Sequence, residues 1–206
     1  MNMNLKNNIL IPSFLILISM LIAPGANAKL QGTVLFGAHG GLGTMGDGGT
    51  ISNRSMSSFG GHAMPALKLG KFIIGPMAQY QFVGQMTDPT TVGDVNLGGT
   101  GYFVGAGLGF FVKRFLIRAS YDFLGSNTGS VQTQDGKTSI YQKASGFTAL
   151  VSFRLKPASR VWLDLYVSQH SFKEQSVGGT VSDLSATPMK ALFYSAGLTF
   201  QFGSLN

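Results

Sequence analysis

The sequence predicts an all-β protein, an eight-stranded antiparallel transmembrane β-barrel preceded by a cleaved signal peptide. Three observations lead to this fold class. The chain begins with a secretory leader, eight later segments alternate apolar with polar residues, and the connections between those segments alternate between short turns and long polar stretches. Together they indicate strands with two unlike faces in an exported protein.

The leader is the first element in the chain. Lys6 precedes an apolar run over 9–22, and a small-x-small pattern ends at Ala28. The run holds about 14 residues, whereas a membrane-spanning helix needs roughly 20, so a permanent anchor is the weaker reading. We expect cleavage between Ala28 and Lys29. The expected organisation is a signal peptide, 1–28, and one barrel domain, 29–206.

Composition fits an exported chain whose surface is largely uncharged. The sequence has no cysteine, 29 glycines, only 11% charged residues and a formal net charge of +7. Without disulfides, an exported domain must gain its stability from packing or from a lipid-covered surface. The basic residues do not cluster into a run, so no nucleic-acid partner is expected.

The eight expected strands follow in order, each with an apolar and a polar face. They lie at 30–38, 59–69, 72–82, 102–112, 115–123, 147–155, 161–167 and 192–202. One face of every strand is nearly free of charge, and the opposite face holds the strand carboxylates and most of the strand bases. No stretch after the leader has 18 consecutive apolar residues, which excludes a helical membrane protein by length. Several of the strands have the roughly 9 to 11 residues of a transmembrane strand.

The connections decide which face is which. Short connections are expected at 70–71, 113–114 and 156–160, and long ones at 40–58, 85–99, 125–142 and 171–188. Regular alternation of short and long connections with an even strand number is typical of outer-membrane barrels, whose short turns are periplasmic. A soluble immunoglobulin-like sandwich has similar strands but does not sort its connections in this way.

The predicted register can be checked within the sequence. A two-residue turn pairs Leu69 with Phe72, and another pairs Val112 with Phe115. Both pairs are apolar, and all four residues lie on the faces that strand alternation alone places outward, so the faces are consistent across the turns.

These features resemble the small eight-stranded outer-membrane barrels of Gram-negative bacteria, the OmpA and OmpX type. The resemblance covers residues 30–202 and rests on the leader, the strand number, the loop asymmetry and the alternating last strand. It implies an outer-membrane location, contact with outer-membrane lipid and lipopolysaccharide, and recognition of the last strand by the barrel-insertion machinery. The insertion signal would be Tyr194, Leu198, Phe200 and Phe202. Residues 203–206 depart from the family, whose members usually stop at the terminal aromatic residue. Because only these four residues follow the last strand, we expect no soluble domain after the barrel.

Four charged residues are expected to face the lumen. Arg118, Asp122, Arg154 and Asp164 have inward positions on three consecutive strands. Arg118, Arg154 and Asp164 lie within a few residues of a short turn, so they should meet at similar depth, and Asp122 lies one step further toward the external side. We interpret them as a structural ion-pair network in an interior shielded from water. The alternative is a gate in a narrow ion path.

Two patterns that suggest chemistry have simpler explanations. The segment 41–46 matches G-x-G-x-x-G, but Asp47 and two glycines follow it, and these cannot start the helix that a nucleotide site needs. We therefore expect a flexible external loop there. Ser168 and His170 share a strand face with Asp164, but residues two and six apart on one strand are too distant for a catalytic relay. We expect no catalytic residue, no cofactor and no metal site.

The expected function is structural and surface-presenting, in envelope integrity or adhesion, with an unknown extracellular partner reached through the long loops. A narrow pore for ions or small apolar solutes is the alternative, and a lipid-modifying enzyme is a weaker one. Eight strands enclose an interior that side chains can fill, so a pore would need those side chains to move.

Overall fold

The computed structural model describes residues 31–46, 54–86, 98–129 and 139–203, and these form nine strands. Their bounds are β1 Gln31–Gly46, β2 Arg54–Leu69, β3 Phe72–Gln85, β4 Gly98–Val112, β5 Phe115–Gly129, β6 Ser139–Arg154, β7 Val161–Val177, β8 Thr180–Asp183 and β9 Met189–Gly203. Within these ranges no helix is long and apolar enough to cross a membrane. The predicted cleavage site at Ala28 and Lys29 lies outside the described residues.

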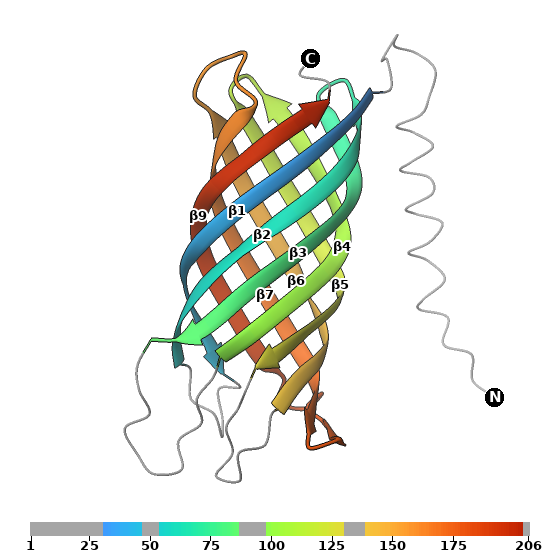
Figure 1. The fold of residues 1–206 in the computed structure, drawn as a ribbon. Coiled ribbons are helices and arrows are strands. Elements are labelled where there is room, and N and C mark those ends of the chain that lie inside the picture. The colour runs from blue at the N-terminus through green and yellow to red at the C-terminus, as the bar shows by residue number, and fades with distance from the viewer. Residues whose placement is uncertain (1–30, 47–53, 87–97, 130–138, 204–206) are drawn as a thin grey trace, which may run out of the picture.

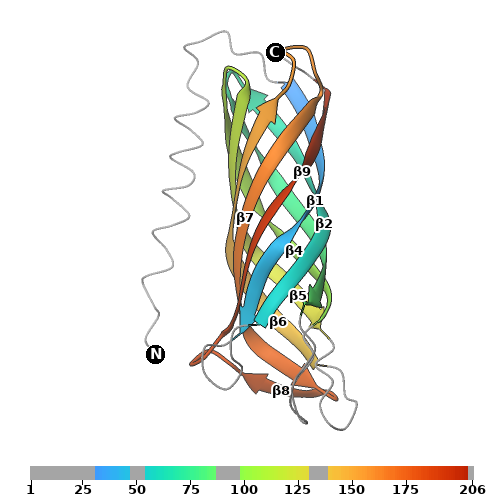
Figure 2. The same cartoon turned by 90° about the vertical axis from the view of Figure 1, so that its left-hand side faces the viewer.

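Eight of these strands close into an antiparallel barrel (Figure 1). Each strand from β1 to β7 pairs with its neighbours in sequence, and β9 pairs with both β1 and β7 to complete the ring. The predicted eight-stranded antiparallel barrel is therefore confirmed. The short strand β8 pairs only with the end of β7, and Figure 2 shows it beyond the end of the barrel. Closure leaves the barrel without an edge strand, as hydrocarbon requires.

The two ends of the barrel differ in their connections. Two-residue turns join β2 to β3 and β4 to β5, and a slightly longer one joins β6 to β7. We call this the short-turn end. Gln31 and Gly203 also lie there, because Gln31 pairs with Lys68 near the β2–β3 turn and Gly203 pairs with Thr33 near the start of β1. The opposite, long-loop end carries the β7–β8 hairpin.

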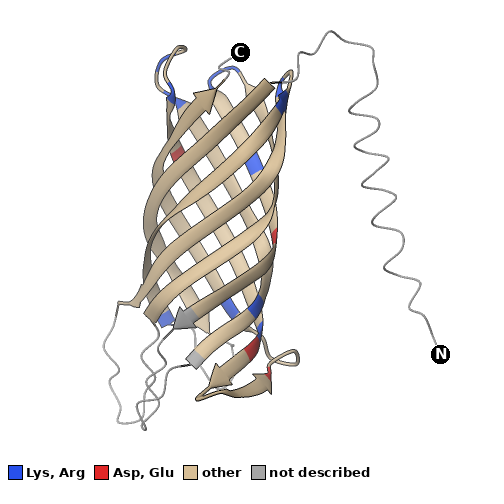
Figure 3. Cartoon of the chain, turned by 45° about the vertical axis from the view of Figure 1, so that its right-hand side comes forward, with Lys and Arg blue, Asp and Glu red and all other residues tan. Residues whose placement is uncertain are grey.

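The predicted register and faces are confirmed. Leu69 pairs with Phe72, and Val112 pairs with Phe115. Large apolar side chains cover the outer wall on every strand of the barrel, and the polar strand residues are buried inside. Few charged residues lie on the strands between the two ends (Figure 3). This is the reverse of a soluble barrel and fits a lipid-facing wall.

The apolar wall has the height of a bilayer core. On β3, the exposed rings run from Phe72 at the short-turn end to Phe82. Ten steps along a strand tilted by about 40° correspond to roughly 25 Å of height, the usual height of the apolar band. Exposed tyrosines on four strands lie toward the long-loop edge of this band, where an aromatic girdle would meet the headgroups: Tyr80, Tyr102, Tyr121 and Tyr194.

Three of the four expected long loops are shorter than predicted, because the strands continue beyond the apolar band. β1 includes the segment 41–46, β5 and β6 enter the predicted 125–142 loop from both sides, and β7 and β8 occupy most of 171–188. The glycine pattern in β1 is thus a strand and not a flexible loop. A Cβ at Gly41 would lie 2.0 Å from the carbonyl oxygen of Tyr194, so glycine there permits close approach of β9.

Candidate functional site

The lumen begins, at the short-turn end, with an apolar layer. Its members are Leu35, Met64, Ala66, Ile73, Met77, Leu116, Leu150, Trp162 and Tyr166. Trp162 is 0% exposed, and the Arg154 guanidinium stands 4.1 Å from its ring centre. Buried side chains from six strands meet in this layer.

A polar cluster around Arg118 lies next to this layer. Arg118 Nη2 donates to Ser152 Oγ at 2.8 Å, to Thr199 Oγ1 at 3.1 Å and to Asp164 Oδ2 at 3.3 Å. Nη1 lies 3.2 Å from His62 Nε2. Thr199 also donates to Asp164. Arg118 is only 1% exposed, and its charge is balanced by a buried carboxylate and several hydrogen-bond partners.

A second polar cluster surrounds Asp122. His170 Nε2 lies 2.9 Å from Asp122 Oδ2, and Gln79 Nε2 donates to the same oxygen at 2.9 Å. Thr148 adds a third contact at 3.1 Å. The Tyr166 hydroxyl donates to Gln79, which links this cluster to the apolar layer. Asp122 is 0% exposed, so its partners replace the water that its carboxylate loses.

A further apolar layer covers the Asp122 cluster at the long-loop end. It contains Met45, Met56, Val83, Phe103, Tyr141, Ala144, Phe172, Met189, Ala191 and Phe193. The Phe103 ring stacks on the His170 ring with centres 3.8 Å apart. Buried side chains therefore occupy the lumen at three levels, which are an apolar layer, the two polar clusters and a second apolar layer.

The structure separates the four residues that were predicted to form one network. Arg118 and Asp164 meet, but Asp122 bonds to His170 and Gln79 in its own cluster. Arg154 instead donates to the carbonyl of Pro157 at 2.8 Å and to Gln201 at 3.1 Å. Arg154 lies four positions nearer the turn than Leu150, the partner of Arg118 across β5 and β6, about 13 Å along the strand. The expectation that Arg118, Arg154 and Asp164 meet at similar depth is therefore wrong for Arg154, and the expected single network is two clusters with Arg154 in neither.

Several members of the clusters were not assigned to a network from the sequence. These are His39, His62, Gln79, Tyr166, His170 and Thr199. Each occupies an inward position of its strand, so strand parity was the available signal. The rings of His39 on β1 and Tyr166 on β7 stack with centres 4.3 Å apart, past the intervening strand β9, a contact that no pattern within one strand can reveal. The described residues include no group of three or more side chains placed to hold a metal ion.

Comparison with known proteins identifies the fold. No family model matches the chain, and no curated protein sequence matches it. The crystal structure of Neisserial surface protein A (NspA) is similar over 82% of this chain and 97% of that one, with 15% identity and a TM-score of 0.54. This chain has the fold of the small outer-membrane barrels.

Two other solved structures resemble the barrel less closely. Ail, the attachment invasion locus protein of Yersinia pestis, in complex with the heparin analogue sucrose octasulfate, matches over 84% of this chain and 99% of its own, with 11% identity and a TM-score of 0.49. The outer membrane protease OmpT of Escherichia coli matches over 88% of this chain and 100% of its own, with 8% identity and a TM-score of 0.33.

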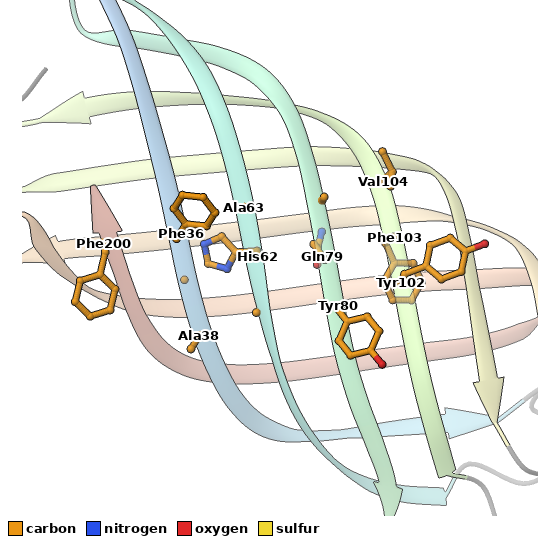
Figure 4. Close-up of a pocket in the computed structure, with 13 residues that line it drawn as sticks. Phe36, Ala38, His62, Ala63, Gln79, Tyr80, Tyr102, Phe103, Val104 and Phe200 are labelled. Atoms are coloured by element: carbon orange, nitrogen blue, oxygen red, sulfur yellow. The ribbon is translucent and has the colours of Figure 1, made fainter. Parts of the chain in front are cut away.

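The final strand of the barrel presents the predicted insertion residues to the outside. Tyr194, Leu198, Phe200 and Phe202 all project outward from β9 and are exposed. Between β9 and β4 the outer wall also has an apolar groove of about 650 Å³ (Figure 4). Small residues such as Ala38, Ala63 and Ala78 form its floor, flanked by larger rings. In a membrane, lipid chains would fill this groove.

Proposed function

We propose that the protein is an integral barrel of the outer membrane of a Gram-negative bacterium, with a structural and surface-presenting role in the envelope and no conducting lumen. The observation that carries this proposal is the occupation of the lumen by buried side chains at three levels. Ion passage would require both apolar layers and the Arg118 and Asp122 clusters to rearrange together. Well-packed layers of buried side chains are rigid, and opening them would expose unpaired charges.

The long-loop end supplies the presented surface. β7 continues past the apolar band and forms a hairpin with β8, whose four residues are all exposed. A hydrogen-bonded hairpin holds its side chains in fixed positions, which suits contact with another surface. This supports a role in adhesion or envelope integrity, with a partner bound outside the cell.

The interior geometry also supports a non-enzymatic role. His170 and Asp122 could in principle act as an acid–base couple. However, Phe103 covers the His170 ring, and both members of the pair are almost fully buried. A lipid headgroup or a peptide at the rim could not approach the imidazole, so we propose that the pair is structural.

The decisive experiment is single-channel recording with the purified barrel in planar bilayers. We expect no current steps above the lipid baseline, while a sixteen-stranded porin added to the same bilayer conducts because its lumen is open. Reproducible steps that scale with the amount of barrel would overturn the proposal in favour of the pore.

The orientation can be tested separately, because the chain has no cysteine of its own. Ser182→Cys places a thiol on β8, and Ala158→Cys places one in the turn between β6 and β7; both positions are exposed. A membrane-impermeant maleimide should label only the Ser182→Cys variant in intact cells and both variants after lysis. Labelling of only the Ala158→Cys variant in intact cells would show that the barrel has the opposite orientation.

A further inference from the structure

A hollow of about 680 Å³ lies on the outer wall at the long-loop end, and we call it the rim hollow. The side of the hollow nearer the middle of the barrel is apolar and is formed by Tyr102, Val104, Phe123 and Leu124. The side nearer the long loops is charged and is formed by Lys143, Lys173 and Glu174. The hollow therefore connects the long-loop edge of the lipid-facing band with a group of charges just beyond that edge.

The hollow exists because the pairing of β5 with β6 is interrupted. Asp122 pairs with Gly146, and the next pair is Asn127 with Tyr141, so the segments between them leave the ladder. Lys143 lies in this interruption with a φ of 51°, in the left-handed region that non-glycine residues rarely adopt. Interruptions of this kind reorient side chains at barrel rims and next to functional sites.

The inner side of the hollow is sealed. A Cβ at Gly125 would lie 2.5 Å from Phe103 Cδ1 and 3.0 Å from the Ala144 Cβ, so these groups pack tightly against the glycine. Phe103 and Ala144 both belong to the apolar layer of the lumen. The rim hollow is thus a site on the outer wall and does not continue into the barrel.

The charged side of the hollow brings two lysines of neighbouring strands close together, which costs electrostatic energy unless an anion lies between them. The pairs Gln142–Glu174 and Ala144–Phe172 place Lys143 opposite Lys173 across β6 and β7. Like charges directly opposite each other on neighbouring strands destabilise a sheet. Glu174 forms an ion pair with Lys143, which offsets one of the two cations. A third lysine, Lys190, is exposed on β9 beside Ser171.

We propose that the rim hollow binds a phosphorylated, acylated lipid of the outer leaflet, with its phosphate between Lys143 and Lys173 and an acyl chain along Val104 and Leu124. This inference rests on the membrane orientation given under the proposed function. Charge complementarity selects an anionic headgroup, and ammonium groups are suitable partners for phosphate. The apolar side of the hollow favours a ligand that carries hydrocarbon, because a free anion would contact only the charged side.

The test is native mass spectrometry of the detergent-solubilised barrel titrated with bisphosphorylated lipid A. We expect Lys143→Gln/Lys173→Gln to weaken binding about twenty-five-fold, since each cation near a lipid surface contributes roughly a factor of five. Glu174→Gln should act in the opposite direction and strengthen binding about five-fold, because it removes the competing carboxylate. Lipid A without phosphates should bind the unaltered barrel as weakly as bisphosphorylated lipid A binds the double variant.

The matched control is Lys71→Gln/Lys156→Gln, which removes the same charge from the short-turn end and should leave binding unchanged. Equal loss in both double variants would mean general charge attraction and would overturn the site. Unchanged binding in Lys143→Gln/Lys173→Gln would do the same. Current recordings and cysteine labelling of the same proteins show separately whether the proposed function fails, and a heat-shifted gel mobility confirms that each variant is a folded barrel.

Discussion

Removal of the buried carboxylate at Asp164 tests whether the interior is a structural core. Asp164→Ala leaves the Arg118 guanidinium, 1% exposed, without the carboxylate that accepts from it at 3.3 Å. Loss of one partner of a buried ion pair typically costs about 3 to 5 kcal/mol, because the remaining charge is uncompensated. Thr199 also loses the acceptor to which it donates. We therefore expect a loss in unfolding free energy of about 4 kcal/mol.

The measurement is urea unfolding of the barrel in lipid vesicles, followed by the fluorescence of its single tryptophan. Trp162 lies in the apolar layer beside the Arg118 cluster, so its emission reports directly on this region. Asp183→Ala is the control, because Asp183 is an exposed acid on β8 that accepts hydrogen bonds from Ser185, and only a small loss, well below that of Asp164→Ala, is expected there. A large, selective rise in bilayer conductance with unchanged stability would refute this reasoning and support an ion path.

Three further predictions concern packing, strand closure and assembly. Trp162→Ala should lower the unfolding free energy by about 3 to 5 kcal/mol through loss of burial and formation of a cavity, measured by urea unfolding followed by circular dichroism, yet remain silent in bilayers because the other levels stay closed. Gly41→Ala should cost about 1 to 3 kcal/mol in the same assay, because its Cβ would clash with the Tyr194 carbonyl, whereas Gly32→Ala on the same strand meets nothing within 4 Å and should be nearly neutral. Phe202→Ala should reduce assembly in cells, measured as the folded fraction in outer-membrane extracts, while Phe72→Ala, at 50% exposure compared with 52%, loses similar lipid contact and should assemble normally.

Strand parity was sufficient to predict most of the fold. Because side chains alternate strictly, one assignment such as Leu69 opposite Phe72 fixes a whole face, and the two-residue turn carries it to the next strand. Parity failed where the pattern itself is interrupted. The glycines of β1 looked like a loop because their function is close approach, and the register shift at Phe123, which has no partner on β4, hid the continuation of β5.

The candidate site was less predictable because heights in a barrel depend on closure. The stagger between strands decides which inward residues share a level, and it is a property of the whole ring. Distance from the nearest turn therefore placed Arg154 with Arg118 incorrectly, and it did not reveal that Asp122 meets His170. Contacts across the lumen join strands that are far apart in sequence, so neither turn lengths nor alternation determine them.

The Arg118 cluster also has a geometry suited to fixing that stagger. Its guanidinium contacts His62 on β2, Ser152 on β6, Asp164 on β7 and Thr199 on β9, so one side chain connects four other strands. Apolar layers tolerate alternative packings of similar volume, whereas a forked donor with bonded partners tolerates few.

We therefore expect Arg118→Met/Asp164→Leu to recover most of the stability lost in Asp164→Ala, since replacing both charges by apolar groups is often neutral or stabilising. The double variant should nevertheless fold to more than one barrel arrangement, seen as duplicated amide resonances for β5 and β9 in detergent micelles. A single set of resonances at recovered stability would show that the apolar layers alone set the register, and that the buried pair is dispensable for both stability and specificity.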